Sequence, residues 1–422
     1  MSTVVRLGGG GPDAMGRLAE LSGQNVFACY QCGKCTAGCP FDFNPQRVVR
    51  QVQLGQLDAA AAEPTTWSCA SCLTCQANCP KGVSPARLMA GLRTLVAEGT
   101  VAGRDGHGHR IRSMMLANNH RLARLGSALA PASNLPFRLP GAGLVQEGLI
   151  GVHHERLLPP FARPSFPAWF SARQPFGDGR RGRVLLFHDT FMDFHYPDIG
   201  IAATELLERA GFRVELTDSV CCGRAMISKG FTKQAAVQAR ENTRRLARQV
   251  EDSYIVGCEP SCLLTLRNEY PELVDGPETS LVASRSLLLD EFLERLAEAD
   301  ELELSFGDPV AGRRVLFQGH CHQKALAHPS AAVSLLRRAG YEPEMISAGC
   351  CGMAGSFGYE KEHYELSRLA GEKAVVPAVR AAPDAQVVVM GVSCRQQIEH
   401  FTGRPTSHLA QALRSALTTE PK

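Results

Sequence analysis

The sequence lacks several features that would assign it to a common functional class. No apolar run approaches the roughly 18 residues needed to span a bilayer, and residues 1–11 lack the basic and apolar pattern of a signal peptide. The formal net charge is only +3 over 422 residues, so nothing indicates nucleic-acid binding. No G-x-G-x-x-G follows an expected strand, so the chain shows no flavin or nicotinamide site of its own.

Cysteine is the informative residue that remains. The sixteen cysteines are about 4% of the chain, below the density of a disulfide scaffold. Such cysteines are more typical of metal ligands, and we therefore expect a cytoplasmic protein. Peripheral contact with a membrane stays open, because only a membrane span is excluded.

Eight of the cysteines form two copies of one spacing, forty residues apart. The first copy is Cys29, Cys32, Cys35 and Cys39, followed by Pro40; the second is Cys69, Cys72, Cys75 and Cys79, followed by Pro80. This C-x2-C-x2-C-x3-C-P run binds [4Fe–4S] clusters in bacterial two-cluster ferredoxins, where the fourth cysteine ligates the other cluster. We therefore predict two [4Fe–4S] clusters, with Cys79 completing the first site and Cys39 completing the second. Zinc and disulfides are the alternatives, but zinc sites usually use two C-x2-C pairs.

The flanks of both copies predict helices rather than the β-hairpins of a small bacterial ferredoxin. Asn44-Pro45 and Ser84-Pro85 follow the two copies at equal offsets and read as helix starts. We expect a disordered arm over 1–20 and an α-helical ferredoxin-like domain over 21–130, with the helix after residue 100 packed back on it. Residues 131–182 are rich in proline and glycine, which predicts an extended linker.

The rest of the chain contains a second duplication. The strand-like runs 183–187 and 314–317 are each followed by a helical pattern, a Cys-Cys-Gly tripeptide, another helix and strand, and a Ser-Cys pair. Strands that alternate with helices predict parallel sheets. We expect a duplicated α/β cysteine-rich domain with half-domains at 183–310 and 311–422, related by a pseudo-twofold axis.

The two halves carry unequal cysteine sets. The second half offers four thiolates, Cys321, Cys350, Cys351 and Cys394, which are enough for a third iron–sulfur cluster. The first half offers Cys221, Cys222, Cys258 and Cys262, with Asp189-Thr190 where Cys321 would stand. We expect structural thiols there, although the sequence leaves open whether this half binds a metal. His320 and His322 flank Cys321 and are expected to hydrogen-bond rather than to ligate.

At these residues the chain resembles known families. The run from Cys29 to Pro40, with Trp67-Ser-Cys69 through Pro80, resembles the small iron–sulfur subunit of heterodisulfide reductases over residues 20–100. The remainder resembles the cysteine-rich Cys-Cys-Gly family. Its stretches 187–191, 319–324, 349–360 and 393–398 look most like the iron–sulfur portion of FAD-linked D-2-hydroxyacid dehydrogenases.

The resemblance has one departure with functional weight. The resemblance to heterodisulfide reductases implies noncubane catalytic clusters, each built from a lone cysteine, the adjacent pair and a C-x2-C. Here Gly391 and Glu259 stand where the C-x2-C of each half would begin. Neither half carries the full five-cysteine set.

These patterns predict an electron-transfer subunit of a flavin-dependent oxidoreductase complex rather than an enzyme alone. Serial clusters take one electron at a time, which suits a partner flavin on another chain that collects two from an organic substrate. The alternative is a catalytic heterodisulfide reductase-like subunit that reduces a disulfide or related sulfur substrate at the Cys-Cys-Gly site. A redox-inert bridging scaffold is the third hypothesis. The sequence specifies neither the donor, the acceptor, the organic substrate, the cluster potentials nor the oligomeric state.

Overall fold

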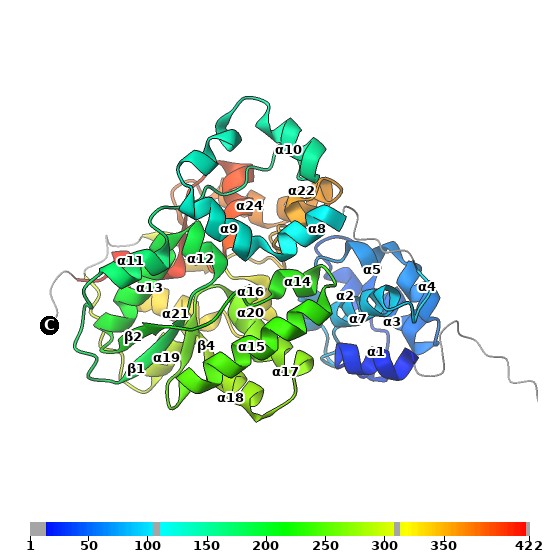
Figure 1. Cartoon of the computed structure of the whole chain (residues 1–422), viewed down its shortest axis with the longest axis horizontal. Helices are drawn as coiled ribbons and strands as arrows, with labels where there is room; N and C mark the ends of the chain where they lie inside the picture. The colour runs from blue at the N-terminus through cyan, green and yellow to red at the C-terminus, as the bar shows by residue number, and fades with distance from the viewer. Residues whose placement is uncertain (1–13, 104–109, 308–312, 419–422) are drawn as a thin grey trace, which may run out of the picture.

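A computed structural model describes residues 14–103, 110–307 and 313–418. A small helical domain lies at one side of a larger α/β body, and a helical cap covers one face of that body (Figure 1). The first helix, α1 (Ala14–Ser22), lies partly within the predicted arm, so the expectation of disorder was wrong for residues 14–20. The reason is burial, because Leu18 is almost completely enclosed against α7 (Pro85–Ala97).

The helical domain repeats its own elements at the forty-residue offset. The first copy contains η1 (Val26–Ala28), α2 (Lys34–Ala37) and α3 (Pro45–Gln53). Next come α4 (Leu57–Ala62), α5 (Pro64–Ser68) and α6 (Thr74–Ala77), and α7 closes the second copy. Asn44 caps α3 through its side chain, as its position before Pro45 predicts. Valines of α3 and leucines of α7 pack into one core, which confirms the helical ferredoxin-like class.

The segment after this domain does not pack back on it as expected. Helices α8 (Arg110–Ala117) and α9 (Asn119–Ala128) instead contact α14 (Arg224–Ser228) and α12 (Thr190–Phe194) of the α/β body. The buried Arg112 side chain explains this docking, because it bonds Gly151 O at 2.8 Å and the carboxylates of Glu360 and Glu362.

The proline-rich stretch 131–182 is not an extended linker. It forms η2 (Ala132–Asn134), η3 (Pro136–Arg138), α10 (Ala142–Ile150) and α11 (Phe166–Ala172). Its prolines begin η3 and stand in the first turn of α11, positions at which a missing amide hydrogen costs little. Fully buried Phe166 then anchors α11 beside Gly200 of α13 (Pro197–Arg209).

The α/β body contains two four-stranded parallel sheets with the same strand order, β2-β1-β3-β4 and β6-β5-β7-β8. The first consists of β1 (Arg183–Phe187), β2 (Arg213–Leu216), β3 (Ile255–Gly257) and β4 (Ser286–Leu288). The second consists of β5 (Arg314–Gln318), β6 (Glu342–Met345), β7 (Gln386–Val389) and β8 (Thr406–His408). The expected duplicated α/β domain with parallel strands is therefore confirmed.

Helices cover both sheets and join the halves. The first half adds α15 (Thr232–Val250), α16 (Pro260–Leu264), the π-helix η4 (Thr265–Glu269), α17 (Tyr270–Leu273), α18 (Pro277–Arg285) and α19 (Leu289–Glu298). The second adds α20 (Cys321–Leu326), α21 (Ser330–Arg338), η5 (Phe357–Tyr359), α22 (Tyr364–Glu372), α23 (Val375–Ala381), α24 (Val392–Thr402) and α25 (Leu409–Ser415). Helix α13 packs on α25 and α19 packs on α21, two equivalent contacts across a pseudo-twofold axis.

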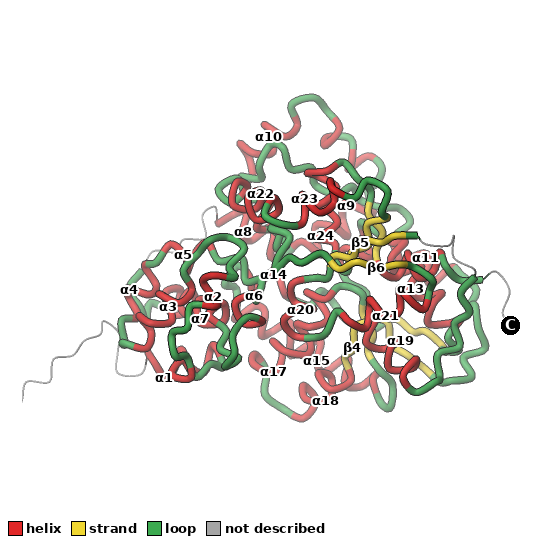
Figure 2. Tube along the Cα trace, turned by 180° about the vertical axis from the view of Figure 1, so that it is seen from behind, coloured by secondary structure: helices red, strands yellow, loops and turns green. Residues whose placement is uncertain are grey.

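One apolar core joins the two halves across these helices. Seen from behind, α6 of the small domain lies beside α20 of the second half (Figure 2), and the two helices are in contact. Within the described residues, no helix combines the length and apolar character that a membrane crossing requires.

Candidate metal centres

The two ferredoxin-type loops share an unusual backbone. Gln31 and Ser71 have φ of 63° and 52°, and Gly33 and Leu73 have φ of 80° and 60°. These left-handed residues turn each loop tightly, and only one of the four is glycine. Backbone strain of this kind, repeated at both sites, is typical of a functional loop.

The eight cysteines line two separate cavities in the crossed sets that the spacing predicts. Cys29, Cys32, Cys35 and Cys79 line one cavity, and Cys69, Cys72, Cys75 and Cys39 line the other. Each fourth cysteine has thus crossed to the loop of the other copy. Four soft thiolates around one small cavity fit a [4Fe–4S] cluster. Ligation itself stays a prediction.

The two cavities differ in their exposure. Cys32 of the first site is exposed, whereas Cys72 and Cys75 of the second are buried. Burial raises the pKa of Cys69 to about 11 and that of Cys75 well above its usual value. Thiols of this kind resist ionisation in a dry pocket unless a cation, such as cluster iron, compensates the thiolate charge.

The second half of the α/β body brings its four predicted cysteines together. Cys321 begins α20, Cys350 and Cys351 follow β6, and Cys394 lies in α24. Hydrogen bonds from Cys350 and from Cys394 hold the pKa of Cys351 well below its usual value, while those of the two donors are raised. All four thiols are buried.

A half-buried cation lies beside this third thiol group. Lys324 Nζ donates to Ala348 O at 2.6 Å and feels the charge of all four thiols. Burial lowers the pKa of Lys324, although the thiolates oppose that shift. A four-thiolate set with a neighbouring ammonium fits an anionic iron–sulfur cluster better than it fits an inert core.

The histidines that flank Cys321 are both engaged in hydrogen bonds. His320 Nδ1 accepts from the backbone N–H of His322 at 3.1 Å and so caps α20. His322 Nε2 lies 3.0 Å from Ser71 O in the small domain. Burial lowers the pKa of both rings, which keeps them neutral at pH 7.

The first half assembles a smaller set. Cys221, Cys222 and Cys262 pack together in the core of this half, and Thr190 lies beside Cys221 in the place that Cys321 takes beside Cys350. Cys258 is not part of this group and packs in the core shared by the halves. Asp189 caps α12, because its Oδ1 accepts from the N–H groups of Phe191 and Met192 at 2.8 and 3.2 Å.

The structure also explains the departure at Gly391. A Cβ atom there would lie 2.7 Å from the His320 ring and 3.2 Å from the Glu259 carboxylate. The same carboxylate accepts from Val392 N at 2.8 Å. Glu259 and Gly391 therefore form a tight polar junction between the halves, with no room for a further thiol.

The second and third thiol groups are in direct contact. Cys72 and Cys350 pack in one buried cluster, and the interaction with the Cys350 thiol lowers the pKa of Cys72 to about 7. Around them, Phe41 packs edge-on against Phe357 at 5.2 Å between ring centroids. The bond from His322 to Ser71 O spans the same interface. An electron could thus pass between these sites without crossing solvent.

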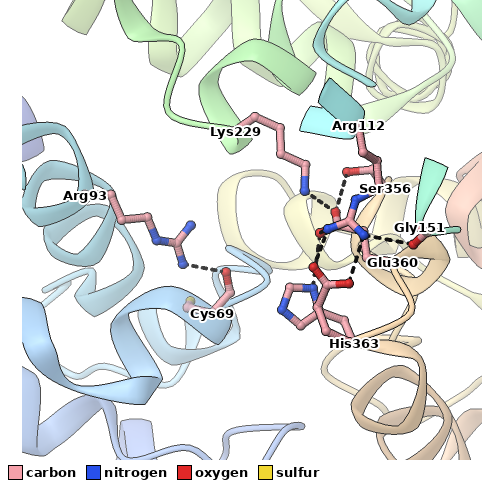
Figure 3. A network of polar contacts seen from close by, with 9 residues as sticks. Cys69, Arg93, Arg112, Gly151, Lys229, Ser356, Glu360 and His363 are labelled. Carbon is pink, nitrogen blue, oxygen red and sulfur yellow. Dashed lines mark hydrogen bonds and ion pairs between the residues drawn. The ribbon is translucent and has the colours of Figure 1, made fainter. Parts of the chain in front are cut away.

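Sequence reasoning missed the charged residues that surround these sites. Buried Arg93 donates to Cys69 O, and a separate network around Glu360 joins α8, the first half and the second half (Figure 3). Arg93 and Gln53 stand at the same offset from Cys69 and Cys29, so the repeat offered a signal for that pair. Nothing in the sequence pattern pointed to the Glu360 network.

Comparison with known proteins matches this architecture. Residues 28–83 match the family described as 4Fe-4S dicluster domain, and residues 185–267 and 315–399 match the family described as cysteine-rich domain. The chain is 27% identical over 311 residues to the C subunit of the anaerobic glycerol-3-phosphate dehydrogenase of Escherichia coli, covering 72% of this chain and 77% of that one.

Two further relatives match shorter regions. Lactate utilization protein A of Geobacillus kaustophilus is 29% identical over 185 residues, which cover 42% of this chain and 74% of that protein. D-2-hydroxyglutarate dehydrogenase of Escherichia coli is 29% identical over 233 residues, 54% of this chain but only 22% of the relative. The similarity to that large enzyme therefore covers a minor part of it.

Proposed function

We propose that this chain, which matches a 4Fe-4S dicluster domain and, twice, a cysteine-rich domain, is the electron-transfer subunit of a flavin-dependent oxidoreductase complex. Electrons would come from a flavoprotein on another chain and leave to a further acceptor. Iron–sulfur clusters would supply one-electron chemistry at the thiolate sites. The relatives support this role, because one of them is named as a subunit of a dehydrogenase.

The observation that carries the proposal is the packing of Cys72 and Cys350 in one buried cluster. It places the second ferredoxin-type site directly against the thiol group of the cysteine-rich domain. The first site lies next to the second, because each exchanges its fourth cysteine with the other. Three cluster sites in a row form a path from the exposed Cys32 to the interior of the α/β body.

The arrangement favours conduction over catalysis at the Cys-Cys-Gly site. The exposed fractions of Cys321, Cys350, Cys351 and Cys394 are 8%, 2%, 3% and 1%. A disulfide substrate needs an accessible sulfur for exchange or cluster attack, and this group offers none. The cytoplasmic location that we propose is supported by the sixteen free cysteines, which suit a reducing compartment.

The test is to purify the tagged full-length chain anaerobically from its own host together with its bound partners. We expect the preparation to contain FAD on a different polypeptide. Adding glycerol 3-phosphate, lactate or D-2-hydroxyglutarate in turn should bleach the cluster absorbance in the complex with one of them and leave the isolated chain oxidised. An isolated chain that contains stoichiometric FAD, or that oxidises any of these substrates unaided, would overturn the proposal.

A further inference from the structure

The two ferredoxin-type sites receive the same two hydrogen bonds from different residues. At the first site, Gln53 Nε2 donates to Val26 O at 3.1 Å and to Cys29 O at 2.8 Å. At the second, Arg93 Nε donates to Thr66 O at 2.6 Å, and its Nη2 donates to Cys69 O at 2.8 Å. Each donor and each acceptor of the second set lies forty residues after its counterpart.

The difference between these counterparts is one full positive charge. Gln53 is neutral, whereas an arginine stays protonated in proteins. Arg93 is 6% exposed, and burial lowers its pKa, while the charges of the Cys69 thiolate and of the Glu360 carboxylate oppose that shift. Across the three described stretches of the chain, no carboxylate forms an ion pair with it at 4.0 Å or less. Figure 3 shows its guanidinium directed at Cys69, apart from the charges around Glu360.

A buried cation without a carboxylate partner is unfavourable unless another anion compensates it. An iron–sulfur cluster held by four thiolates is such an anion, and Cys69, whose backbone carbonyl accepts from the guanidinium, lines the cavity of this site. Reduction adds one more negative charge to that cluster. A fixed positive charge nearby therefore stabilises the reduced form more than the oxidised form.

We propose that Arg93 is a potential-setting residue, which raises the reduction potential of the cluster at the Cys69 site above the value that a neutral residue would give. The proposal rests on the electron-transfer function argued above. With this higher potential, the cluster at the Cys69 site would accept an electron from the cluster at the first site and keep it close to Cys350.

Hydrogen bonds to the cysteine sulfurs act on the same potentials. The first site has an additional N–H···S bond, because both the backbone N–H and the side-chain amide of Gln31 lie within 3.6 Å of Cys29 Sγ. At the second site, Ser71 N donates to Cys69 Sγ at 3.4 Å. A neutral amide acts more weakly than a whole charge in a dry site. Each variant must therefore be compared with the wild type at the same site.

The repeat supplies the matched variants. Arg93→Gln gives the second site the residue of the first and keeps two amide donors, while Gln53→Arg gives the first site the residue of the second. Arg93→Lys retains the charge. Each full-length chain would be reconstituted with iron and sulfide and titrated against redox mediators, with electron paramagnetic resonance as the readout.

We expect Arg93→Gln to lower the potential of one cluster signal and Gln53→Arg to raise that of a different one. In each of these two variants, the reduction potential of the affected cluster should change by at least about 59 mV, which corresponds to a tenfold change in the equilibrium constant for one electron. Arg93→Lys should keep most of the wild-type value. If Arg93→Gln fails to assemble its cluster, Gln53→Arg and Arg93→Lys still decide the case.

Unchanged potentials in chains with full cluster content would overturn the proposal and reduce Arg93 to a structural hydrogen-bond donor. The titration needs no partner protein, so that result would leave the electron-transfer function standing. Conversely, a chain that never associates with a flavoprotein would refute the proposed function without altering the measured potentials.

Discussion

The buried carboxylate of Glu360 offers the most quantitative test of how the chain holds its parts together. Its side chain is 1% exposed and pairs with Arg112 of α8 at 3.1 Å and with Lys229 of the first half. His363 lies 3.4 Å away, and Ser356 donates at 3.3 Å (Figure 3). The perturbation is Glu360→Gln, which keeps the shape of the side chain and removes its charge.

The pKa of Glu360 gives the magnitude. Burial alone would raise this pKa, but hydrogen bonding from His363 and the charge of Lys229 lower it from 4.5 to about 2. This lowering of the pKa corresponds to about 3 kcal/mol of stability, similar to the roughly 3–5 kcal/mol lost when one partner of a buried pair is removed. Glu360→Gln would also leave Lys229 buried without this counter-charge.

The sign of the pH dependence follows from the lowered pKa. The carboxylate contributes its full stability above its unfolded value of 4.5 and loses it as the pH falls toward about 2. The carboxylate of Glu360 is therefore ionised in both the folded and the unfolded chain between pH 6 and pH 8. The titration of Glu360 itself should therefore add no pH dependence to the stability difference between the wild type and Glu360→Gln across that range, in which iron–sulfur clusters can be kept intact.

Thermal unfolding of the cluster-loaded chain, followed anaerobically by circular dichroism, measures the effect. For an α/β body of this size, about 3 kcal/mol corresponds to a fall of roughly 6–12 °C in Tm. The matched control is Glu362→Gln, because Glu362 also pairs with Arg112 but is 37% exposed. It should cost less than about 1 kcal/mol. A Tm for Glu360→Gln no lower than that of the control would refute the reasoning.

Two further predictions concern the cysteines. Cys39→Ala should damage the cluster nucleated by Cys69, Cys72 and Cys75, because Cys39 lines that cavity; loss of only the other cluster signal would show that the crossed assignment is wrong. Changing both Cys350 and Cys351 to Ser should remove about four irons per chain and one paramagnetic signal, whereas the same change at Cys221 and Cys222 should leave both. The reverse outcome would mean that the metal-binding half has been misassigned.

Repetition explains why much of this architecture could be predicted from the sequence. The doubled cysteine run indicated two crossed sites, and the structure lines two cavities with those sets. The repeated strand, Cys-Cys-Gly and Ser-Cys pattern indicated two parallel sheets of equal topology. In both cases the repeated pattern corresponds to one structural unit. Because each pattern occurs twice in the chain, the two copies support the same prediction.

Contacts between distant segments were not predictable in this way. The apolar residues of α8 and α9 showed a helix but not its partner, which is set by Arg112 reaching carboxylates about 250 residues away. The prolines of 131–182 predicted an extended chain, whereas Pro136 and Pro167 lie in the first turns of short helices that cover the α/β body. The contact between Cys72 and Cys350 likewise depends on how two domains dock. The boundaries between the units stay predictions.

The most direct test of the central claim is the cluster content of the full-length chain, purified anaerobically and reconstituted with iron and sulfide. Three thiolate sites in series predict about twelve irons and twelve sulfides per chain, with three distinct paramagnetic signals on stepwise reduction and no bound flavin. About eight irons or fewer per chain, or zinc in their place, would contradict the account.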